Sequence, residues 1–192
     1  MRLRPYFGSL LSLAIAFGLM VGIPSTASAQ LQPWTTVGSA GTMDDNTLKV
    51  VTLDGSTSVL AGFQRGGVTI RYNVVAVNGL FGSPSIFMLV RYRATPDPIV
   101  FGRADSQVVV KLIEVNLNTG LTTTKLVFDS NKFPASNDFQ TQSVSTCPAL
   151  SMFDFGSNAY YIEVQLGKRQ PFSGSPGIQA IQVSAFNCNP IG

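Results

Sequence analysis

The chain has 192 residues, of which 45% are hydrophobic and only 12% charged, and it contains no histidine. Without histidine, Ser-His-Asp and Cys-His catalysis and histidine-ligated zinc are excluded. The 13 basic and 10 acidic residues give a formal charge of +3, and the basic ones are scattered. The sequence therefore has no stripe of cations for the phosphates of a nucleic acid.

The first 29 residues have the order of a secretory signal peptide. Arg2 and Arg4 precede an apolar run from Leu10 to Ile23, and the small residues Ala27–Ala29 follow. This order predicts cleavage after Ala29, and the apolar run is too short and too interrupted for a membrane span. We therefore expect a secreted protein, extracellular or periplasmic, with no membrane span after cleavage. Its 11 remaining basic and 10 acidic residues leave a net charge near +1.

Beyond residue 30, no segment has a helical period over ten or more residues. Apolar and polar residues alternate instead, between clusters of Gly, Pro, Asn, Asp and Ser, which predicts β-strands. About nine strands are expected, over residues 48–53, 57–63, 68–77, 86–93, 108–117, 121–128, 139–146, 158–166 and 177–186. The sequences LDGS at 53–56 and NTG at 118–120 predict tight turns, the second with Gly120 at positive φ.

Many short strands with regular turns predict one all-β domain over residues 30–192, an antiparallel β-sandwich of jelly-roll type. The alternation in residues 68–77 predicts one buried row: Val68, Ile70, Tyr72, Val74 and Ala76. The alternation in residues 158–166 predicts a second buried row: Tyr160, Ile162, Val164 and Leu166. Trp34 lies before the first expected strand, where we expect it to close one end of the sandwich, with sugar stacking as the alternative.

Cys147 and Cys188 are the two cysteines. In an exported chain they predict a disulfide, which would close a loop of about 40 residues. Loop-closure entropy assigns such a bridge roughly 4 kcal/mol. A bridge between two chains is the alternative. A reactive cysteine is disfavoured because the sequence has neither a CxxC motif nor a histidine base.

Four stretches together resemble a group of small exported bacterial β-proteins. They are WTTVGSAGTMDDNTLKVV, VTIRYNVVAV, TGLTTTKLVFDSNKFP and FDFGSNAYYIEVQL, and the resemblance spans most of the chain after the signal peptide. It implies a bacterial exported β-protein. It carries no activity, ligand or catalytic residue to particular positions.

Polar and aromatic side chains fall on the expected outer faces of the strands. The candidate binding residues are Tyr161, Glu163, Gln165, Arg71, Arg91 and Arg93. Planar polar groups beside an aromatic ring suit the hydroxyls and the apolar faces of sugars. The first hypothesis is therefore a non-enzymatic module that binds a glycan or another cell-surface polymer, with carbohydrate the favoured ligand class.

A structural, self-assembling protein is the second hypothesis. The chain is poor in charge, its strands are rich in Val, Ile and Thr, and Phe87 and Leu89 fall on an outer face. Apolar residues there predict a covering loop or a contact between subunits.

A small glycoside hydrolase is the third hypothesis. Such an enzyme needs two carboxyl groups across the scissile bond, and Asp154 and Glu163 are the pair to nominate, with Glu114 as a further acid. The opposing interpretation makes Asp154 a turn residue and Glu163 a solvated strand residue. No cofactor is expected from the motifs.

A structural calcium ion is a separate hypothesis. Asp44 and Asp45 cluster in one expected loop, and Asp129 begins another. Hard cations take oxygen ligands from such loops. The opposing interpretation is turn chemistry, because aspartate also accepts hydrogen bonds from the backbone of its own loop.

Overall fold

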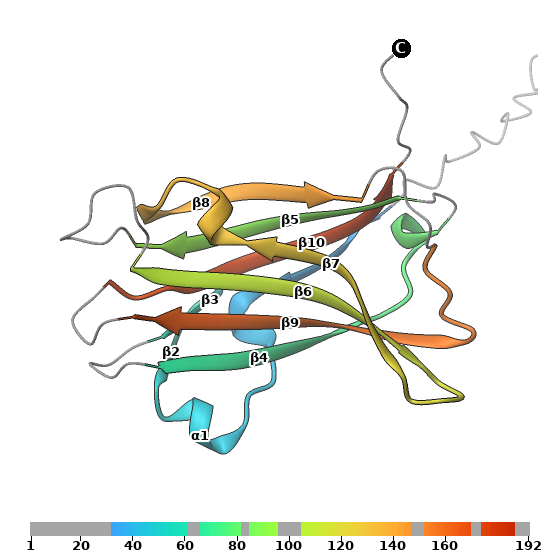
Figure 1. The fold of residues 1–192 in the computed structure, drawn as a ribbon, viewed down its shortest axis with the longest axis horizontal. Helices are drawn as coiled ribbons and strands as arrows, with labels where there is room; N and C mark the ends of the chain where they lie inside the picture. Colours follow the sequence, from blue (N-terminus) through green and yellow to red (C-terminus); the bar gives the residue numbers. More distant parts are fainter. Residues whose placement is uncertain are drawn as a thin grey trace, which may run out of the picture.

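The computed structural model is an all-β sandwich of two antiparallel sheets, called sheet A and sheet B below. It describes residues 32–60, 66–81, 85–95, 105–146, 152–169 and 174–186. Sheet A contains β1 (Trp34–Val37), β2 (Val51–Asp54), β3 (Thr57–Leu60), β5 (Ser85–Ala94), β8 (Ser136–Ser145) and β10 (Gly177–Phe186). Sheet B contains β4 (Gly66–Val74), β6 (Ser106–Asn116), β7 (Thr122–Asp129) and β9 (Asn158–Lys168). The long strands of both sheets run along the long axis of the molecule (Figure 1).

Short helices connect some of these strands. They are the 3-10 helices η1 (Gly38–Ala40), η2 (Asn78–Leu80) and η3 (Ser130–Lys132) and the single-turn α1 (Asp45–Leu48). None of the helices in the described ranges has the length and hydropathy that a membrane span requires.

The strand order is β2-β3-β10-β5-β8 in sheet A and β4-β9-β6-β7 in sheet B. β3 and β1 pair one after the other along one edge of β10, and β5 pairs along its other edge. From β3 to β6 and from β7 to β10, the chain changes sheet at each successive strand, which is the alternation typical of a jelly roll. The sandwich predicted from the sequence is therefore confirmed.

Each of the nine predicted strands is present, with shifted ends. The prediction was wrong at Leu48, which ends α1, and at Ala76, which is exposed because β4 already stops at Val74. β1 was not predicted from the sequence. Trp34 begins this strand and is only 6% exposed, so its indole packs in the core as part of sheet A.

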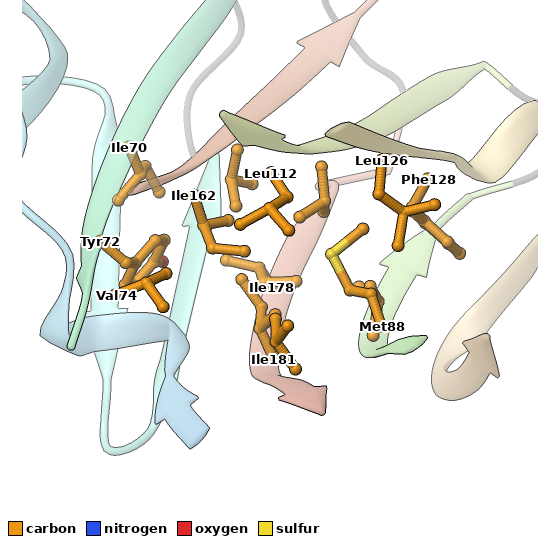
Figure 2. Packing of buried hydrophobic residues seen from close by; sticks show 14 of the residues in the cluster. Ile70, Tyr72, Val74, Met88, Leu112, Leu126, Phe128, Ile162, Ile178 and Ile181 are labelled. Atoms are coloured by element: carbon orange, nitrogen blue, oxygen red, sulfur yellow. The ribbon is translucent and has the colours of Figure 1, made fainter. Parts of the chain in front are cut away.

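The core lies between the two sheets and is built from the alternate residues of each strand. Figure 2 shows Ile70, Tyr72 and Val74 of β4, Ile162 of β9, and Ile178 and Ile181 of β10 within one cluster of buried side chains. Full burial of one such aliphatic side chain contributes about 1.5–3 kcal/mol. The predicted rows along β4 and β9 are therefore core, except at Ala76.

The hairpin between β6 and β7 forms as predicted. Gly120 has φ of 72°, a conformation that glycine adopts without a steric cost. The Asn116 side-chain oxygen accepts hydrogen bonds from the amides of Asn118 and Thr119, which fixes the loop.

Three register irregularities interrupt the ladders, and each one inserts extra residues. Lys125 is the extra residue of β7 opposite β6, and Gln179 is the extra residue of β10 opposite β5. The third irregularity lies in β8, where residues 137–139 fall between the partners of Tyr92 and Ala94. Bulges of this kind redirect side chains and occur often beside functional sites.

Several predictions fall on residues outside the described ranges. Residues 1–29 and the two cysteines, Cys147 and Cys188, are among them. The signal peptide, the secretion that follows from it, and the disulfide therefore stay predictions.

Candidate functional site

The outer face of sheet B carries a row of charged side chains across three strands. Arg71 on β4, Glu163 on β9 and Lys111 on β6 are direct partners in the strand register. They point away from the core because Ile70 and Tyr72, Ile162 and Val164 occupy the alternate positions.

Glu163 is the centre of this row. Its carboxylate lies 3.7 Å from the Arg71 guanidinium and 3.6 Å from the Lys111 ammonium, and Gln165 Nε2 donates to it at 2.9 Å. The side chain of Glu163 is only 15% exposed, whereas that of Arg71 is 53% exposed. The interpretation of Glu163 as a strand residue on the outer face is correct, but the side chain is not freely solvated, because two cations and an amide cover it.

A shallow hollow of about 330 Å³ continues the same face beyond Gln165. Its floor is formed where Gly67 and Gly167 face each other on β4 and β9, beside Gln107 of β6. Two glycines in register leave the backbone bare, which permits a close approach by a ligand. The hollow was missed at the sequence level, although Gly167 continues the alternation of the outward row.

Tyr161 is half-buried and lies at the opposite end of the outward-facing positions of β9 from Gly167. From Tyr161 to Gly167 the outward positions of β9 extend over about 20 Å, at roughly 3.4 Å per residue. The stripe formed by Tyr161, Glu163, Gln165 and Gly167 is called the β9 stripe below.

Arg91 and Arg93 do not join this site. Both lie on β5, in sheet A, and point outward from the opposite face of the sandwich. The structure therefore separates the predicted binding residues into two groups: Tyr161, Glu163, Gln165 and Arg71 on sheet B, and the two arginines on sheet A. The alternation of a strand tells which residues share its face, but not to which sheet the strand belongs.

Glu114 lies on neither outer face. Its side chain points to the inner side of the sandwich, at one end of the core. The Tyr160 hydroxyl donates to Glu114 at 2.9 Å, and the Lys125 ammonium lies 3.1 Å from the same carboxylate oxygen. The side chains of Lys125 and Glu114 are 12% and 18% exposed. The bulge in β7 turns Lys125 inward to this partner.

An aromatic cluster packs around this group. The ring of Tyr160 meets Phe153 and Phe155 edge-on, each at a centroid distance of 4.9 Å. Burial raises the pKa of the Tyr160 hydroxyl, and the hydrogen bond that it accepts from the Asp154 amide opposes this shift. The neutral hydroxyl therefore serves as a fixed donor to Glu114.

Asp154 has the turn role that was considered for it. Its carboxylate accepts hydrogen bonds from the amides of Gly156 and Ser157, in the turn before β9. Glu163 lies inside β9 on the outer face, so the two acids nominated for hydrolysis occupy different parts of the fold.

The aspartates of the calcium hypothesis come from two separate segments. Asp129 ends β7 and accepts hydrogen bonds from the Asn131 amide and from Gln107. Asp45 begins α1, directly after Asp44. Among the described residues, no three acidic or cysteine side chains gather as a metal site would require. The calcium ion stays a prediction, and Asp129 already performs the turn role.

The fold and its faces define a class: an antiparallel β-sandwich of jelly-roll type with polar side chains on both outer surfaces. No protein-family model matches the sequence, and no curated protein matches it.

Several solved structures are similar to parts of the chain. A cyclase from Fischerella sp. TAU, in complex with an indolyl butanone, aligns with a TM-score of 0.41 and 16% identity over 68% of this chain. The alignment spans 64% of the cyclase's length, less than two thirds. The xylan-binding module CBM15 aligns with a TM-score of 0.39 and 10% identity, over 71% of this chain and 82% of its own. A family 29 carbohydrate-binding module from Piromyces equi aligns at 0.35 and 10% identity, over 83% of each chain.

Proposed function

We propose that this protein is a non-enzymatic glycan-binding module and that the glycan lies along the β9 stripe. One observation carries the proposal: Tyr161, Glu163, Gln165 and the bare floor at Gly167 follow one another on one outer face. The length of about 20 Å suits several consecutive sugar rings better than a single small ligand.

The chemistry of the stripe suits hydroxyl groups. The network around Glu163 holds donors from Arg71, Lys111 and Gln165 beside a carboxylate acceptor, in fixed positions. Fixed donors and acceptors lose little side-chain entropy when a ligand binds. The Tyr161 ring supplies an apolar surface for a sugar face. Because Glu163 faces both cations and offsets one of their two positive charges, an uncharged glycan is the favoured ligand here.

The positions of the acids favour binding over hydrolysis. The Asp154 carboxylate is engaged in a turn, and both oxygens of Glu163 are within reach of cations. A glycosidase holds its two carboxyl groups on either side of one bond, about 5–10 Å apart. Asp154 instead lies in the turn before β9, whereas Glu163 lies inside that strand.

A panel of uncharged polysaccharides tests the proposal by affinity electrophoresis of the purified protein. We expect retardation by at least one polymer, and Tyr161→Ala and Gln165→Ala should each weaken binding about tenfold. Arg91→Ala, on the opposite sheet, is the matched control and should bind normally. Failure of the folded protein to bind any polymer of the panel would overturn the proposal.

A further inference from the structure

The outer face of sheet A presents two arginines whose positions depend on irregular strand pairing. Arg91 and Arg93 are two residues apart on β5, so both side chains point outward from the same face. The extra residue of β10, Gln179, lies beside Arg91, and the extra residues of β8 end at Phe139, beside Arg93. Two of the three irregularities of the fold therefore surround this pair.

Uncharged groups hold both guanidinium groups in place. Arg91 donates from Nε to the Gln179 side chain and from Nη1 to the Thr141 hydroxyl at 3.4 Å. Arg93 donates from Nε to the Ser175 carbonyl at 3.0 Å, and its guanidinium carbon lies 5.0 Å from the centre of the Phe139 ring. These contacts orient the groups and leave nitrogen atoms of each fork for a ligand.

Neither arginine forms an ion pair with a described residue, in contrast to the basic residues of sheet B. Arg71 and Lys111 pair with Glu163, and Lys125 pairs with Glu114. The described acid closest in sequence to Phe139 is Asp138, which is exposed and forms an ion pair with neither arginine. The positive charge of the pair is therefore not neutralised by the described part of the chain.

An apolar hollow of about 480 Å³ lies next to Arg91 on the same face. Ala180 of β10 is the register partner of both Arg91 and Val37, so these residues form one row across β5, β10 and β1. Neighbouring strands are about 4.8 Å apart, which places Val37 roughly 10 Å from Arg91. The small side chain of Ala180 forms the floor, Leu89 lines the hollow, and Val37 is 43% exposed at the rim.

We infer that this face binds an acidic polysaccharide, with a sugar ring over the hollow at Ala180 and its carboxylate or sulfate on Arg91 and Arg93. Guanidinium groups bind both oxyanions through paired N–H donors, and the shared chemistry covers uronic acids and sulfated sugars alike. Nucleic acid fits less well, because it requires several cations along a backbone, and the described strands of sheet A carry two on this face. The site is separate from the β9 stripe and does not depend on it.

Two pairs of polymers separate charge from sugar identity: polygalacturonate with its methyl ester, and dextran sulfate with dextran. Affinity electrophoresis of the purified protein should show stronger binding to at least one acidic member than to its neutral partner. Arg91→Ala and Arg93→Ala should each weaken that binding about tenfold, and added salt should weaken it further. Which acidic member binds distinguishes a carboxylate from a sulfate ligand.

Two further variants test the geometry. Ala180→Trp fills the hollow without removing charge and should lower affinity for the acidic polymer. Arg169→Ala removes an exposed arginine directly after β9 of sheet B and should leave this affinity unchanged. Circular dichroism confirms that each variant is folded. Equal binding of the acidic and neutral members, normal binding by the double variant R91A/R93A, or tighter binding to duplex DNA would each overturn the inference.

The experiments distinguish failure of the proposed neutral-glycan site on sheet B from failure of the acidic-polymer site on sheet A. Tyr161→Ala should leave the binding of acidic polymer intact, and Arg91→Ala should leave the binding of neutral glycan intact. If Ala180→Trp changes only the sedimentation of the protein and no polymer binds, the face is a contact between copies of the chain and the inference fails.

Discussion

The hydroxyl of Tyr72 donates a hydrogen bond of 2.6 Å to the backbone oxygen of Gly38, and this bond links the two sheets. Tyr72 belongs to sheet B, whereas Gly38 lies beside β10 and also accepts from the Ser58 hydroxyl of β3 at 2.7 Å. A Cβ atom on Gly38 would lie 2.0 Å from the Ile178 carbonyl oxygen. The two sheets therefore meet at a position with no room for a side chain.

Gly38→Ala should consequently destabilise the fold by about 3 kcal/mol, because the backbone of β10 must move. Urea unfolding of the variant and the parent gives this value directly. Gly167→Ala is the matched control: its Cβ would meet no atom closer than 4.0 Å, and we expect a change below about 1 kcal/mol. Equal stability of Gly38→Ala and the parent would contradict the tight contact.

Glu114→Gln should destabilise the protein by about 2 kcal/mol, because it leaves the largely buried Lys125 ammonium without its counter-charge. Tyr160→Phe removes two hydrogen bonds, to Glu114 and from the Asp154 amide, but no charge, and should cost about 1–2 kcal/mol. Lys125→Met in the Glu114→Gln background should recover part of the loss. If Glu114→Gln unfolds at the same urea concentration as the parent, the ion pair contributes nothing to stability.

The free energy of unfolding should fall as the pH rises above 10. Burial raises the pKa of Tyr72 and Tyr160 and raises that of Tyr92 to about 12. Between the unfolded and folded pKa values, the folded state therefore binds more protons than the unfolded state. Each tyrosine then removes up to about 1.4 kcal/mol of stability per pH unit.

Lys168 has the opposite effect on the pH dependence of the free energy of unfolding. Burial lowers its pKa, and attraction to Asp105 opposes that shift, so stability gained from this residue rises with pH up to the unfolded pKa of 10.5. Three tyrosines outweigh one lysine above pH 10. Urea unfolding at about pH 8 and about pH 11 measures the net slope, and Tyr92→Phe should reduce it. A free energy of unfolding that is constant or rises over this range would contradict the burial of the three hydroxyls.

Gly167→Leu should weaken binding of neutral glycan at least tenfold, because the side chain fills the hollow at the end of the β9 stripe. Its stability should change little, since a Cβ atom on Gly167 would lie 4.0 Å from the Gln107 carbonyl oxygen, an ordinary van der Waals contact. Isothermal titration with the glycan identified in the screen measures the affinity. Unchanged affinity would remove the hollow from the binding site and leave only the polar row.

Alternation along the sequence was sufficient to predict the strands and most of the core. Val68, Ile70 and Tyr72 point inward as their spacing required, and Glu163 and Gln165 point outward. Trp34 was not recognised as the start of a strand because β1 has only four residues and too few alternations to detect.

The candidate sites were less predictable, for two physical reasons. Residue spacing does not assign a strand to a sheet, so Arg71 and Arg91 were named together as candidate binding residues although the sandwich separates them. The positions of β-bulges also cannot be recognised from the residue pattern of a single sequence. Gln179 reaches Arg91 and Lys125 reaches Glu114 only because extra residues interrupt the ladders.

Backbone amide shifts of the isotope-labelled protein, titrated with the strongest neutral glycan of the screen, test the central claim most directly. We predict that the largest shifts fall on Tyr161, Glu163, Gln165 and Gly167 and on their register partners in β4 and β6. Shifts concentrated on sheet A, or a saturating glycan that leaves the amides of β9 unmoved, would contradict glycan binding along the β9 stripe.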